Sequence, residues 1–145
     1  LWKMKKLAAY CIFLLFAGIQ TGQAQSVTGK WKTFDDETGD AKSIVEIYEK
    51  NGKIYGKIIE ILEKGKEDKT CDKCKGSKKD KPVKGMVIIE GLSKDGDNWE
   101  DGTILDPRNG KEYKCRINLE NSDKLKVRGY LGVSLLGRTQ YWTRI

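Results

Sequence analysis

The 145-residue sequence predicts an all-β protein that folds as an eight-stranded antiparallel up-and-down barrel. No segment shows the sustained i, i+3, i+4 apolar spacing of an amphipathic helix. Eight short strand-like runs recur instead, separated by residues that favour turns. Without helices to cover a sheet, such strands best protect their edges by closing into a barrel, and a β-sandwich is the alternative.

The runs are bounded by turn residues. Asp and Gly at 35–40 and 94–97, Asn51-Gly52, and the Pro-containing stretch 106–110 all favour turns, and Asn-Gly is the strongest two-residue hairpin motif. The last three strands follow one another closely, and two of them alternate apolar and polar residues, as in a sheet with one solvated face. The eight predicted strands are 27–34, 43–50, 53–63, 85–92, 98–105, 111–120, 124–131 and 137–144.

Two motifs indicate how the barrel closes. Gly29 and Trp31 stand on the first strand, and Trp142 and Arg144 stand on the last. In an up-and-down barrel these strands are antiparallel neighbours, so Trp31 can plug one end while Arg144 lies over its indole ring. A Gly-x-Trp opening with a closing Arg is typical of lipocalin-like or calycin-like barrels. We assign these four residues a structural role.

The N-terminal residues predict export. Lys3, Lys5 and Lys6 precede an apolar run at 7–19, and Gly22-Gln23-Ala24 provides the small residues of a cleavage site. We therefore expect residues 1–24 to be a cleaved signal peptide and 25–145 to be a single β-barrel domain in the periplasm or outside the cell. No second apolar run follows, so a membrane-spanning segment is not predicted.

Positive charge is concentrated in one segment. After residue 24 the chain has 25 basic and 21 acidic residues, or +4, whereas residues 64–84 alone carry nine lysines and four acids, or +5. This segment either contacts an anionic envelope surface or is a solvated loop. It has no aromatic residues on which bases could stack, and export removes the usual targets, so nucleic acid is not an expected partner.

The segment also contains Cys71-Asp72-Lys73-Cys74, which permits a disulfide, half of a metal site or a redox dithiol. We favour the disulfide, because export places the chain where disulfides form. A metal site is not predicted, since the sequence has no histidine. Cys115 falls on the apolar face of its strand and is expected to be a buried free thiol.

Candidate ligand-binding residues lie around the last hairpin, which is glycine-rich and apolar. Such a hairpin can form a lip for an apolar ligand, with polar partners from the final strand, or it is simply a tight turn. No catalytic constellation is recognisable: histidine is absent, and Asp35-Asp36 is interpreted as a solvated turn. We predict no enzyme activity and no cofactor. The candidate residues are Tyr130, Leu131, Leu135, Arg138 and Gln140.

The chain carries a set of short motifs: Gly29-Lys30-Trp31-Lys32-Thr33, 35–39, 71–76, 104–107, 109–111 with Tyr113 and Cys115, 127–132 and 134–140. In these motifs the whole mature chain resembles a family of small exported bacterial proteins, domain of unknown function family 2147 (DUF2147). The resemblance implies a lipocalin-like barrel exported from the cell, and it implies no established activity. From these observations we expect non-catalytic binding of a small hydrophobic molecule, or alternatively an envelope-interaction or stress-associated module acting through residues 64–84.

Overall fold

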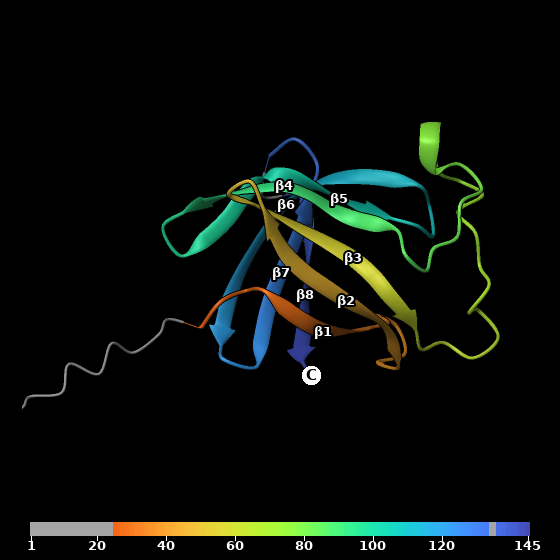
Figure 1. Ribbon diagram of the computed structural model, residues 1–145, viewed down its shortest axis with the longest axis horizontal. Helices are drawn as coiled ribbons and strands as arrows, with labels where there is room; N and C mark the ends of the chain where they lie inside the picture. Colours follow the sequence, from red (N-terminus) through yellow and green to blue (C-terminus); the bar gives the residue numbers. More distant parts are fainter. Residues whose placement is uncertain (1–24, 134–135) are drawn as a thin grey trace, which may run out of the picture.

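The computed structural model describes residues 25–133 and 136–145, and it confirms the predicted closed barrel of eight antiparallel strands in chain order (Figure 1). Strand ends differ from the prediction by up to three residues. Because the first strand pairs with the last, the β-sandwich alternative is excluded. The strands are β1 (Gly29–Phe34), β2 (Ala41–Lys50), β3 (Lys53–Ile61), β4 (Val87–Asp95), β5 (Asn98–Asp106), β6 (Lys111–Asn121), β7 (Lys124–Tyr130) and β8 (Gly137–Arg144).

The seam between β1 and β8 has a short ladder. It registers two residue pairs, Trp31 with Arg144 and Lys32 with Thr143, whereas the β7–β8 ladder registers seven. A closed barrel needs this seam, because an open one would leave two unpaired strand edges. Side chains at the seam therefore have to supply part of the closure.

Trp31 and Arg144 reinforce this seam. The Trp31 side chain is fully buried, and its indole N–H donates to the carbonyl of Val27 at 2.9 Å. The Arg144 guanidinium lies 4.3 Å from the indole centroid, a cation–π distance. A Cβ added at Gly29 would come within 2.7 Å of Arg144 Nη1, so only glycine leaves room for the guanidinium.

Arg144 also ties three chain segments together. Its guanidinium donates to the carbonyls of Ser122 at 2.7 Å, Thr28 at 2.9 Å and Ser26 at 2.7 Å. The first of these lies in the β6–β7 turn, and the other two precede β1. This end of the barrel is filled by fully buried side chains, which include Ile47, Ile54, Leu92, Ile117 and Leu125. We call it the closed end.

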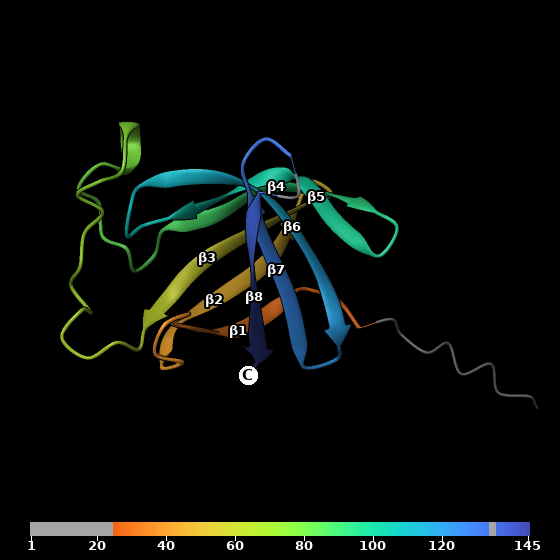
Figure 2. The same ribbon diagram turned by 180° about the vertical axis from the view of Figure 1, so that it is seen from behind.

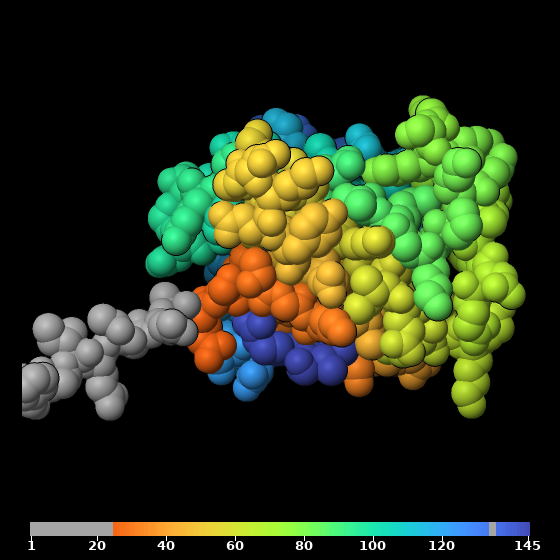
Figure 3. All heavy atoms as spheres, in the orientation of Figure 1, coloured from red at the N-terminus to blue at the C-terminus, as the bar shows by residue number. Residues whose placement is uncertain are grey.

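Residues 62–86 connect β3 to β4 and form an ordered strap beside the barrel. The strap appears in yellow-green next to the β5–β6 hairpin in Figures 1 and 2, and it bulges from one edge of the space-filling view in Figure 3. Backbone hydrogen bonds join Val83 to Lys69 at 2.9 Å and Cys71 to Lys81 at 2.8 Å. A short 3-10 helix spans Gly76–Lys78, and no helix in the described part of the chain is long and apolar enough to cross a membrane.

We expect Arg144→Ala to lower the free energy of unfolding by about 2–4 kcal/mol, because it removes a cation–π contact and charge-assisted hydrogen bonds. Arg144→Lys should recover only part of this loss, since an ammonium lacks the planar fork that reaches three carbonyls. Urea denaturation followed by tryptophan fluorescence measures both changes. As a control, exposed Lys53→Ala should change stability by less than about 0.5 kcal/mol. An Arg144→Ala value as small as this control would contradict the closure role.

Candidate ligand-binding site

The barrel is hollow at the end opposite the closed end. A cavity of about 720 Å³ opens there, and all eight strands contribute to its wall. Its rim is formed by residues of the strap and of the β1–β2, β5–β6 and β7–β8 connections. The volume lies within the range of roughly 300–1,000 Å³ that is usual for small-molecule pockets. We call the open end the mouth.

The inner wall of the cavity is apolar. Ile58, Ile88 and Val127 line it and are 2–6% exposed. Ile104 adds a further apolar side chain, and Trp142 lines the cavity while its indole N–H donates to Gln140 Oε1 at 3.2 Å. Gly129 also lines the wall, and its lack of a side chain leaves space between β6 and β8. This part of the cavity therefore presents an apolar surface to a ligand, with few hydrogen-bonding groups.

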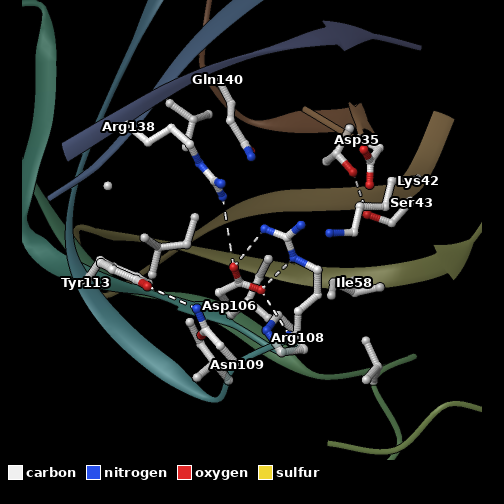
Figure 4. A pocket seen from close by; sticks show the side chains of 18 of the residues that line it. Asp35, Lys42, Ser43, Ile58, Asp106, Arg108, Asn109, Tyr113, Arg138 and Gln140 are labelled. Carbon is white, nitrogen blue, oxygen red and sulfur yellow. Dashed lines mark hydrogen bonds and ion pairs between the residues drawn. The ribbon is translucent and has the colours of Figure 1, made fainter. Parts of the chain in front are cut away.

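Charged groups gather at the mouth around Asp106 (Figure 4). The Arg108 guanidinium donates to both carboxylate oxygens of Asp106, at 3.3 and 3.1 Å, and the Arg108 backbone N–H donates at 2.9 Å. Arg138 makes an ion pair with Asp36 at 3.1 Å and approaches Asp106 to 3.9 Å. Burial alone would raise the pKa of Asp106, but the hydrogen bonds and charge of Arg108 outweigh it and lower the pKa. Asp106 is thereby held as a carboxylate.

A lysine and an aspartate face the mouth from the other side. Asp35 accepts the backbone N–H groups of Glu37 and Thr38, each at 2.9 Å, and these bonds lower its pKa. Lys42 is partly buried, and burial lowers its pKa, with the charge of Arg108 adding to the effect. Within the described chain the Lys42 ammonium makes no hydrogen bond and no ion pair within 4.0 Å.

The structure brings three of the predicted ligand-binding residues to the cavity. Leu131, Arg138 and Gln140 line it, although their role in binding remains a prediction. Tyr130 does not line the cavity, because side chains alternate along β7 and Gly129 occupies the inward position. Leu135 lies outside the described residues.

Several mouth residues were missed from the sequence. Lys42, Asp106 and Arg108 gave no signal beyond that of strand ends and turns, where charged residues are common. Asp35 and Asp36 were interpreted as a solvated turn, yet Asp35 lines the cavity and Asp36 pairs with Arg138. The spacing of these residues along the sequence did not show that the segments that carry them meet at the rim of the cavity.

The predicted disulfide between Cys71 and Cys74 is confirmed, and both cysteines are buried. Cys71 Sγ lies 3.5 Å from the carbonyl oxygen of Pro107 in the β5–β6 turn. Gly110, at the end of the same turn, has a φ of +69°, and a Cβ there would overlap the carbonyl of Lys73. The disulfide segment therefore rests directly on the turn that carries Arg108. The described residues contain no cluster of three or more potential metal-ligating side chains.

We expect Gly110→Ala to destabilise the protein more than Gly52→Ala. Both glycines have left-handed backbones, with φ of +69° and +75°, but a Cβ at Gly52 meets nothing within 4 Å. Gly52→Ala should cost about 1 kcal/mol from conformation alone, and overpacking at Gly110 should add roughly 1–3 kcal/mol. Urea denaturation of the two variants measures the difference. Equal costs would contradict the contact between strap and turn.

We expect Cys115 to be unreactive in the folded protein. Its side chain is fully buried, and burial raises the pKa of the thiol to about 12. The reactive thiolate is therefore scarce below that pH. In a protein that comprises residues 25–145, a thiol reagent at pH 8 should label no thiol in the native state. In denaturant without reductant it should label one thiol per chain. Rapid labelling of the native protein would refute the buried position.

Comparison with known proteins assigns the chain to a family. A model described as "Uncharacterized protein conserved in bacteria (DUF2147)" matches residues 29–144. No curated protein matches the chain. Among solved structures, protein HP1028 from Helicobacter pylori, described as belonging to the lipocalin family, has a TM-score of 0.74 and 22% identity over 84% of each chain. At that identity the likeness shows the fold alone. The chain belongs to the DUF2147 family, and its fold is a lipocalin-like barrel.

Proposed function

We propose that this protein binds a small, largely apolar molecule inside the barrel, without transforming it, after export to the periplasm or beyond. The observation that carries the proposal is the cavity of about 720 Å³ above a packed closed end. Protein interiors are normally packed to the density of organic crystals, with few voids larger than a water molecule. A space of this size and apolar lining is therefore suited to a ligand.

The lining supports binding over catalysis. The sequence has no histidine, and the mouth carboxylates of Asp35 and Asp106 have lowered pKa values. A general acid or base works best with a pKa near the operating pH, so these carboxylates are poorly suited to proton transfer at neutral pH. What the cavity offers is apolar surface, which stabilises a bound molecule by about 25 cal/mol for each Å² removed from water.

The alternative, an envelope-interaction or stress-associated module acting through residues 64–84, has less support. Several lysines of this segment already have partners: Lys66 pairs with Glu63 at 2.5 Å, and Lys78 donates to the carbonyl of Val87 at 2.9 Å. Lys79 donates to the carbonyl of Asp72. The exposed lysines without such contacts are Lys64, Lys69, Lys73, Lys75, Lys81 and Lys84, of which Lys69 also lines the cavity.

We expect Gly129→Leu to abolish binding of a neutral environment-sensitive apolar dye, 1-aminoanthracene, because the new side chain fills the cavity between Ile104 and Tyr113. The matched control is Lys126→Leu, which adds the same side chain to the outward face of the same strand. Fluorescence titration should show one saturable site in the wild type and the control.

Two further variants separate the two functions. Leu131→Asp, at the cavity rim, should weaken dye binding by roughly tenfold, because a charge near an apolar ligand is costly. Replacing Lys64, Lys73, Lys75, Lys81 and Lys84, the uncontacted strap lysines that do not line the cavity, with serine should leave dye binding unchanged. If the wild type shows no saturable site, and the serine variant loses association with anionic vesicles, the cavity-binding proposal fails and the strap becomes the functional element.

A further inference from the structure

We infer that the cavity selects a single-chain amphiphile with an anionic headgroup, either a carboxylate or a phosphate monoester. The headgroup would bind at the mouth between Lys42 and Arg108, and the apolar chain would lie against Trp142 and the inner wall. This inference rests on the proposed function and specifies the chemical class of the ligand. It follows from the balance of charges at the mouth, from the position of Lys42 and from the direction in which the cavity closes.

The cavity wall has more cations than anions. Five basic and three acidic side chains line it. Three of the five cations are paired with carboxylates, which leaves Lys42 and Lys69 without an ion pair in the described chain. Glu63 is paired with Lys66 at 2.5 Å, and Asp106 is paired with Arg108 at 3.1 Å. The charged lining residues are Lys42, Lys66, Lys69, Arg108 and Arg138, with Asp35, Glu63 and Asp106.

Lys42 is the cation best placed to receive a ligand anion. Its ammonium has no hydrogen bond or ion pair within the described chain, although the residue is partly buried. Asp35 lies nearby, but two backbone N–H groups already solvate its carboxylate. A partly desolvated cation without a close partner is unfavourable, and an anion in hydrogen-bonding range would offset that cost.

Lys42 and Arg108 approach each other from opposite sides of the mouth. Figure 4 shows their side chains extending from β2 and from the β5–β6 turn toward the same space. Their charges repel, and this repulsion contributes to the lowered pKa of Lys42. An anionic oxygen between them would be attracted by both groups. Arg138 stands at the same rim, but Asp36 at 3.1 Å already balances its charge.

The orientation of the chain follows from the closed end. Trp31 and its buried neighbours block the far end of the barrel, so a ligand has to enter through the mouth. The apolar wall at Ile58, Ile88 and Trp142 would accept the chain, and the charged rim would hold the head. A neutral molecule of the same shape would cover Lys42 without giving it a partner, so it should bind less tightly.

The test uses a matched pair of fluorescent probes, dansylaminoundecanoic acid and its methyl ester, which differ in charge. The wild type should bind the acid at least roughly tenfold more tightly than the ester, the factor expected for one charge-assisted hydrogen bond. Lys42→Met should bring the acid down to the affinity of the ester and leave ester binding unchanged. Lys57→Met, an exposed lysine on β3, is the matched control and should retain the preference.

Competition distinguishes the sources of the anion. Dodecanoate and dodecyl phosphate should displace the acid probe better than dodecanol. The stronger of these two competitors shows whether the mouth prefers a carboxylate or a phosphate headgroup. Lys42→Arg keeps the positive charge and should keep the preference for the acid over the ester. This variant keeps the test valid if Lys42→Met fails to fold. Equal affinity of the wild type for acid and ester would overturn this inference while leaving the proposed function standing. If the wild type binds neither probe, both this inference and the proposed function are overturned.

Discussion

The stacking of Arg144 over Trp31 is the interaction on which the rest of the structure depends. The β1–β8 ladder registers two residue pairs, so the guanidinium, bonded to Ser122, Thr28 and Ser26, supplies much of what closes the barrel. The same contact, with the indole fully buried, seals one end. Because the packed core is concentrated at that end, the opposite half of the barrel can enclose an open cavity without losing its strand pairing.

The mouth is supported from outside the barrel. The Cys71–Cys74 disulfide segment packs against Pro107 and Gly110, at the two ends of the turn that carries Arg108. The strap also contributes Lys69 and Val83 to the cavity rim. The disulfide closes a short loop, so its own entropic contribution is small. Its importance lies in fixing the strap against the turn, which holds Arg108 where it bonds to Asp106.

The sequence was sufficient for the barrel because period-two alternation and turn chemistry are local. Residues at strand ends were harder to assign. Leu131, Arg138 and Gln140 were singled out because they flank one apolar hairpin. Lys42, near the start of β2, and Asp106, at the end of β5, come together only through tertiary structure. Tyr130 differs from the first three residues, because it does not line the cavity. Its neighbours line the cavity, but strand alternation turns its side chain away.

We infer that one half of the barrel is packed and that the other half receives a ligand. Methyl-resolved NMR during titration with dodecanol tests it most directly, because the two halves carry distinct isoleucine and leucine methyl groups. We expect saturable shifts at the cavity residues Ile58, Ile88 and Ile104, with little change at Ile47, Ile54, Ile117 and Leu125 of the closed end. Shifts spread evenly over both sets, or confined to the closed end, would contradict it.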